Sequence, residues 1–109
     1  MLEGAYTRKL LRALKQHAML KSAVIWKHAN PFTRGVPDFS ISIGARTIWV
    51  EVKMQKGKLA PIQKFYLERL RKGAMLVVAM NDGRDAWVED RIVSFDGLVA
   101  EIVQRCFDA

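Results

Sequence analysis

The chain has 109 residues, of which 50% are hydrophobic, so it can bury one hydrophobic core and hardly two, and we expect a single domain over residues 1–109. A formal net charge of +7 favours a polyanionic partner, although basic proteins also bind membranes and acidic proteins. The single cysteine excludes an internal disulfide bond, so we expect a protein of the reducing cytoplasm. The sequence has no apolar stretch long enough for a signal peptide or a transmembrane helix, so we expect no membrane partner.

The first predicted element is an amphipathic helix from Glu3 to about Leu20. Apolar residues such as Leu10 and Leu14 recur at steps of three and four, and basic residues occupy the other faces. At 100° per residue, Glu3 falls within about 20° of Leu10 and Leu14, so its carboxylate leans toward the core side of the helix.

Strands are expected next. Residues 23–26 are a short β-favouring run, and a loop rich in turn residues follows. Residues 38–43 and 47–53 then alternate polar and apolar side chains on both sides of a Gly44-Ala45-Arg46 turn, which predicts a β-hairpin.

A second helix is predicted to begin at Pro61 and to end at Gly73. The continuously apolar residues 75–80 are typical of a buried strand, and a helix between two strands indicates a right-handed parallel crossover. We therefore expect an α/β fold with a small mixed sheet flanked by helices.

The C-terminal elements are less regular in sequence. Residues 85–90 fit no single pattern, and residues 91–93 suit a short edge strand. Ser94 is the expected N-cap of a last helix.

Charge is unevenly divided along the chain. Residues 1–75 hold 15 of the 18 Lys and Arg residues but only four of the 11 acids, and residues 76–109 hold the rest. Among the four isolated acids, Glu51 shares one face of its strand with Lys53, because the two residues are two positions apart. The hairpin would bring Asp38, on the polar face of the preceding strand, to the same end.

Two converging carboxylates repel each other unless a cation lies between them, and oxygen donors with open water positions suit Mg²⁺ or Mn²⁺. A phosphodiester would fill the open positions, and Lys53 could hold or deprotonate the attacking water. The alternative is that Glu51 and Lys53 line a solvent-facing strand while Asp38 caps a turn after Pro37.

The motifs Pro37-Asp38 and Glu51-Val52-Lys53 resemble those of the PD-(D/E)xK nucleases. Additional motifs are similar to the virus-type replication-repair nuclease (VRR-Nuc) domain over about residues 3–80: Gly35-Val36-Pro37-Asp38, Gly57-Lys58-Leu59, Gln63 and Gly73-Ala74.

This resemblance implies a restriction-endonuclease-like fold in which Asp38, Glu51 and the Val52 carbonyl bind the metal and Lys53 serves the attacking water. It also implies that Glu3 is a further metal ligand, although an acid stabilised by the helix N-terminus is an alternative. Gln63 would support the metal site or contact the phosphate, unless it is an ordinary surface residue.

Short stand-alone members of this family resemble dimeric endonucleases that cut branched DNA, including four-way (Holliday) junctions. A DNA-repair enzyme of a bacterium or a phage-infected cell is therefore expected. The alternatives are a nickase or linear-duplex endonuclease of the same fold, and a catalytically silent DNA-binding module.

Several other residues could contact DNA or a second copy of the chain. The candidate phosphate contacts are Arg8, Arg12, Lys15, Arg34, Lys56 and Lys58. We expect Trp87, Phe95, Leu98 and Phe107 either to form a dimer surface or simply to cover the sheet. Trp26, Trp49 and Trp87 suit core, interface or base-stacking roles, and we expect Trp49 to pack under the first helix. His17 and His28 have no metal-ligand partner at standard spacing.

Overall fold

The computed structural model describes residues 1–28, 35–54, 61–70, 73–89 and 91–108. Six strands form one mixed sheet in the order β1 to β6. All neighbouring strands are antiparallel except β3 and β4, which are parallel. The strands are β1 (Val24–Lys27), β2 (Phe39–Ile43), β3 (Arg46–Met54), β4 (Ala74–Met80), β5 (Asp85–Val88) and β6 (Arg91–Ser94).

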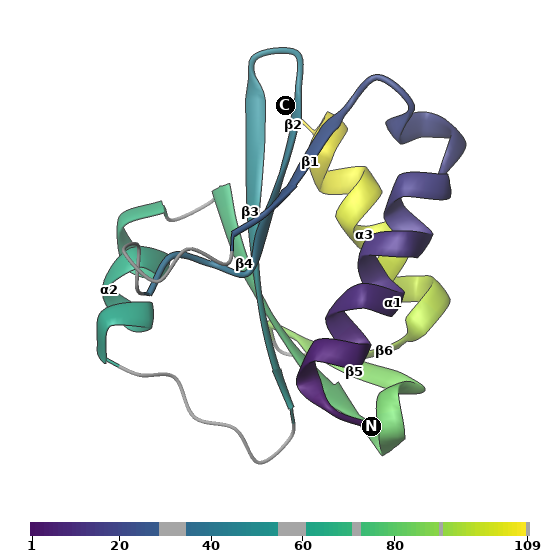
Figure 1. Ribbon diagram of the computed structural model, residues 1–109, viewed down its shortest axis with the longest axis vertical. Coiled ribbons are helices and arrows are strands. Elements are labelled where there is room, and N and C mark those ends of the chain that lie inside the picture. The colour runs from purple at the N-terminus through teal and green to yellow at the C-terminus, as the bar shows by residue number, and fades with distance from the viewer. Residues whose placement is uncertain (29–34, 55–60, 71–72, 90, 109) are drawn as a thin grey trace.

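Helices cover both faces of this sheet. Figure 1 shows α1 and α3 on one side and α2 on the other. The helices are α1 (Glu3–Gln16), α2 (Pro61–Leu70) and α3 (Phe95–Phe107), with the short 3₁₀ turns η1 (Ala18–Leu20) and η3 (Asn81–Gly83). The predicted mixed α/β class is thus confirmed.

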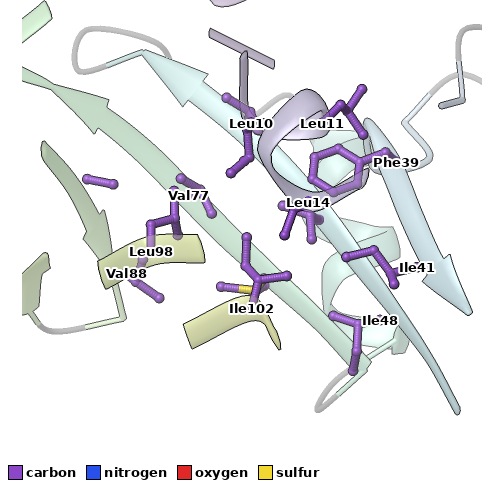
Figure 2. Close-up of a cluster of buried hydrophobic side chains, with 14 of the residues drawn as sticks. Leu10, Leu11, Leu14, Phe39, Ile41, Ile48, Val77, Val88, Leu98 and Ile102 are labelled. Carbon is purple, nitrogen blue, oxygen red and sulfur yellow. The ribbon is translucent and has the colours of Figure 1, made fainter. Parts of the chain in front are cut away.

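The hydrophobic core lies between the sheet and the pair α1 and α3 (Figure 2). Leu10 and Leu14 from α1 and Leu98 and Ile102 from α3 are each completely buried there. The apolar side chains of the predicted alternation in β2 and β3 point into this core, because successive residues of a strand face opposite sides. Their polar neighbours therefore face α2.

The predicted first helix is too long by about four residues. It ends at Gln16, and His17 has an extended backbone with φ −70° and ψ 130°. The His17 Nδ1 accepts a hydrogen bond of 3.2 Å from the Met19 backbone N–H. A side chain that binds a nearby backbone donor offers the chain an alternative to the helical hydrogen bond, which explains the earlier end.

The C-terminal region resolves the ambiguous stretch. Residues 85–88 form β5, and β6 pairs with it along the edge of the sheet. Ser94 is the N-cap of α3 as predicted, and its Oγ accepts the Gly97 N–H at 3.0 Å. Of the helices in the described ranges, none has the combination of length and apolar character that crossing a bilayer requires.

Candidate active site

The β2–β3 hairpin positions the first carboxylate. Phe39, the first residue of β2, pairs with Val50, so Asp38 lies across from Glu51 just before β2 begins. The Asp38 Oδ2 accepts the backbone N–H of Val52 at 2.7 Å. This bond fixes the Asp38 side chain on β3, at the level of Glu51.

Glu51 is the second carboxylate, and it is only 2% exposed. Gln63 reaches it from α2 and donates its Nε2 to the Glu51 Oε2 at 3.0 Å. The other oxygen, Oε1, is buried without a hydrogen-bond partner in the described part of the chain. A buried carboxylate oxygen in that state is costly unless a cation or a proton compensates it.

The electrostatics of Glu51 reflect this environment. Burial raises the pKa of Glu51 to about 8, and the negative charge of Asp38 acts in the same direction. A hydrogen bond to the Asp38 carboxylate, which Glu51 can donate only when it is protonated, raises the pKa further. The positive charge of Lys53 lowers the pKa but does not offset these effects. The structure thus brings Asp38, Glu51, Lys53 and Gln63 together, as the sequence predicts.

Glu3 lies at the edge of this group. It is the first residue of α1, and its negative charge makes the smallest of the contributions that raise the pKa of Glu51. Within the described ranges, no three residues from His, Cys, Asp and Glu are arranged to hold a metal ion. Glu3 is therefore in electrostatic reach of Glu51, and its role as a direct ligand stays a prediction.

The backbone carbonyl of Val52 is a third oxygen donor, beside the two carboxylates. In a strand, the N–H and C=O of one residue point to the same side. Because the Val52 N–H points to Asp38, the Val52 carbonyl also faces the side of β2, beyond the residue where β2 begins. The Asp38 and Glu51 carboxylates with this carbonyl are hard oxygen donors of the kind that Mg²⁺ and Mn²⁺ prefer.

Gly35 explains how the segment before Asp38 reaches this place. It has φ +84°, in the left-handed region that favours glycine. A Cβ atom at Gly35 would lie 2.6 Å from the Ile62 Cγ1 of α2. The glycine therefore permits close packing between the segment leading to Asp38 and the helix that carries Gln63.

Trp49 does not pack under α1, so that prediction is wrong. It occupies the face of β3 opposite α1 and stacks on His28, with ring centroids 5.0 Å apart and an angle of 27° between the rings. His28 also has a direct link to the site, because its backbone N–H donates to the Asp38 carbonyl at 2.8 Å. Sequence reasoning missed this link because it crosses a loop whose pairing no local pattern specifies.

Three of the predicted phosphate contacts meet in one groove. Arg8, Arg12 and Lys15 of α1 and Lys27 of β1 line a surface groove of about 500 Å³ together with Leu11 and Gln16. The groove contains four cations and no acid among these lining residues. Arg34, Lys56 and Lys58 lie outside the described residues, as does the Gly57-Lys58-Leu59 motif.

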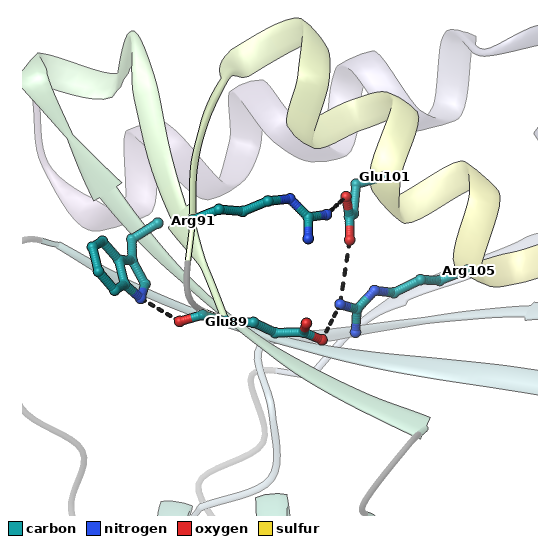
Figure 3. Close-up of polar contacts among 5 residues, drawn as sticks. Glu89, Arg91, Glu101 and Arg105 are labelled. Atoms are coloured by element: carbon teal, nitrogen blue, oxygen red, sulfur yellow. Dashed lines mark hydrogen bonds and ion pairs between the residues drawn. The ribbon is translucent and has the colours of Figure 1, made fainter.

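The acidic C-terminal region has a different arrangement (Figure 3). Glu101 forms ion pairs with Arg91 and Arg105, and Arg105 also pairs with Glu89. A hydrogen bond from Arg91 is the main reason that the pKa of Glu101 lies below its usual value. These acids are neutralised by arginines and form part of the scaffold.

The expected dimer surface is only partly available. Leu98 is completely buried, and Phe95 packs edge-on against Tyr6 at 6.1 Å, so both residues cover the sheet. Trp87 and Phe107 are 43% and 48% exposed. Only the latter two could contact a second copy.

Comparison with models of known protein families found no match for this chain, and comparison with curated proteins found none either. The central feature of the candidate site is a buried, incompletely compensated carboxylate beside a second carboxylate, a lysine and a glutamine.

Proposed function

We propose that the protein is a divalent-metal-dependent DNA endonuclease with a restriction-endonuclease-like fold, similar to the VRR-Nuc domain, that hydrolyses phosphodiester bonds in branched DNA. The observation that carries the proposal is the buried Glu51 Oε1 without a partner, next to Asp38 and Lys53. A structural ion pair would have a cation at this position, as Glu101 has. The Glu51–Asp38 pair instead brings two carboxylates together, and a bound cation would offset their mutual repulsion.

Asp38, Glu51 and the Val52 carbonyl would hold Mg²⁺ or Mn²⁺. Such an ion, when bound, polarises a phosphoryl oxygen and makes water more acidic. Gln63 keeps the Glu51 carboxylate in place through its 3.0 Å hydrogen bond. Lys53, on the same strand face as Glu51, would orient the attacking water and offset the negative charge that develops on the phosphate.

DNA is the substrate that the surface charge favours. The groove of Arg8, Arg12, Lys15 and Lys27 would follow a phosphate backbone without reading its sequence. A four-way junction has two-fold symmetry, so a homodimer with one site per chain would match it.

Two alternative functions predict different results in a cleavage assay. A linear-duplex endonuclease or nickase would use the same residues on a different DNA, whereas a silent binding module would bind DNA without cutting it. The intact set of Asp38, Glu51 and Lys53 favours an active enzyme over the silent module.

One panel of cleavage assays tests the proposal. The purified protein is incubated with Mg²⁺ or Mn²⁺ on labelled linear, nicked, forked and four-way-junction DNA, beside Asp38→Ala and Lys53→Ala. Glu101→Gln is the matched control, because it removes an acid outside the site. We expect junction cutting that falls at least about a hundredfold in both site variants and persists in the control.

The other outcomes are equally clear. If both site variants cut as fast as the wild type, the assignment of the site is contradicted. If the wild type cuts linear DNA faster than junction DNA, the linear-duplex endonuclease is favoured. DNA binding without cutting under any metal supports the silent module. The mass of the protein in solution, alone and with junction DNA, tests the homodimer separately.

A further inference from the structure

A row of three aromatic rings lies on the sheet face that carries the proposed active site. His28 is stacked between Trp49 and Trp26: its ring lies 5.0 Å from Trp49 and 6.5 Å from Trp26, and the interplanar angles are 27° and 29°. The strand register explains the row, because Trp26 pairs with Ser40 and Ser40 pairs with Trp49. The His28 Nε2 lies 2.8 Å from the Ser40 Oγ, which holds the imidazole between the two indoles.

The row is attached to the site at two points. Trp49 precedes Glu51 by two residues on the same face of β3, a distance of about 7 Å along the strand. The His28 backbone N–H donates to the Asp38 carbonyl at 2.8 Å. Trp26 is two strands away from Trp49, or about 10 Å, so the outer end of the row lies within a few nucleotides of a phosphate at Asp38 and Glu51.

Trp26 ends the row at the edge of the sheet, and 66% of it is exposed. Its indole is therefore accessible to a flat partner, with the stacked rings of His28 and Trp49 behind it. Its chain neighbour Lys27 lines the basic groove with α1. Edge strand β1 therefore offers an aromatic surface on one side and cations on the other, which matches the two chemical parts of a nucleotide.

We propose that Trp26, backed by His28 and Trp49, is a stacking platform for an unpaired DNA base near the scissile phosphate. The bases of continuous duplex are already stacked on their neighbours, so only DNA that offers an unpaired or unstacked base, as at the branch point of a fork, can use the platform. An aromatic face accepts any base, so the selection depends on DNA structure and not on sequence. The inference rests on the proposed function, because it locates the platform relative to that active site.

Binding without divalent metal tests the platform apart from catalysis. Fluorescence anisotropy with EDTA compares a labelled continuous duplex with a labelled fork of equal length, for the wild type, Trp26→Ala, Trp26→Phe and Met19→Ala. We expect Trp26→Ala to weaken fork binding about tenfold and to leave duplex binding nearly unchanged. Trp26→Phe should restore most of the affinity. Met19→Ala, which removes an exposed apolar side chain of η1, should leave the affinity for both DNAs unchanged.

Several results would overturn the platform. They are an unchanged fork affinity in Trp26→Ala, an equal loss on fork and duplex, or a change in the mass of the free protein, which would make Trp26 an interface residue. Failure of the platform and failure of the nuclease are distinguishable. Mg²⁺-dependent cutting that ignores Trp26→Ala contradicts the platform alone, and Trp26-dependent fork binding without cutting contradicts the nuclease alone.

Discussion

Two glutamate clusters of this protein, the buried one at Glu51 and the partly exposed one at Glu101, have opposite electrostatics. Glu101 lies between two arginines, and the hydrogen bond from Arg91 lowers its pKa. Glu51 lies beside Asp38, and burial raises its pKa to about 8. The charge of Glu101 is balanced by arginines of the folded chain itself. The charge of Glu51 destabilises the fold until a proton or a metal ion compensates it. We therefore place the proposed metal site at Glu51 and not at Glu101.

The largest effect is expected from Glu51→Gln, which removes the charge and keeps the shape. It should reduce cutting by at least about a hundredfold, because the amide is a poor metal ligand. The same change should stabilise the metal-free protein at pH 8 by an amount on the order of a few kcal/mol. Activity assays and chemical denaturation at that pH measure the two effects, and a loss of both activity and stability would contradict the role of Glu51.

The pH dependence of stability should separate the clusters. Because the pKa of folded Glu51 is above its usual value of 4.5, the folded state retains a proton that the unfolded chain loses. The contribution of Glu51 is therefore complete below about pH 4.5 and is lost as the pH rises to about 8. Glu101 has the opposite sign, because its lowered pKa makes its contribution disappear as the pH falls below the usual range.

If the proposed site holds a metal ion, added Mg²⁺ should reverse the loss at high pH, since Mg²⁺ would bind the ionised carboxylate of Glu51. At about a hundred times its Kd, it should raise the free energy of unfolding by about 3 kcal/mol. Thermal unfolding at pH 6 and pH 8, with and without Mg²⁺, measures this effect. The increase should be larger at pH 8 and absent in Glu51→Gln, and an increase that persists in the variant would locate the metal elsewhere.

Gln63→Ala should give a smaller effect of about tenfold on Mg²⁺ affinity or activity. Gln63 orients a ligand and is not itself one of the proposed donors, and changes to such residues usually cost 10- to 100-fold. A titration of activity against Mg²⁺ concentration measures the change, and Gln63→Glu serves as a comparison of similar size. An unaltered Mg²⁺ requirement would show that the 3.0 Å hydrogen bond to Glu51 is without consequence.

Glu101→Gln should have the smallest effect, a loss of about 1 kcal/mol in the free energy of unfolding at neutral pH. Its ion pairs are partly exposed to solvent, with side-chain exposures of 46% for Arg91, 21% for Arg105 and 18% for Glu101. Mg²⁺ response and cutting should match the wild type. A change in either would mean that the two clusters are coupled.

Much of the fold follows from local patterns. The alternation of residues 38–53 fixes which side chains of the hairpin share a face, and the serine before the last helix marks its first turn through the Ser94–Gly97 hydrogen bond. Residues 85–90 show no clear period in the sequence, because the four-residue strand β5 has only two inward apolar side chains, Ala86 and Val88. The end of α1 was misplaced because the competing His17 hydrogen bond involves a residue that also suits the helical stripe.

The sequence by itself determined that Glu51 and Lys53 share one strand face and that Asp38 lies near them, because a strand repeats every two residues. Only the tertiary structure decided that this face lies opposite α1, that Gln63 of α2 donates a hydrogen bond to Glu51, and that Trp49 stacks on His28. The physical reason is the sequence separation of the residues that interact. Alternation is a property of one strand, whereas burial, and with it the pKa of Glu51, depends on which helix covers that strand and on pairing between segments far apart in the chain.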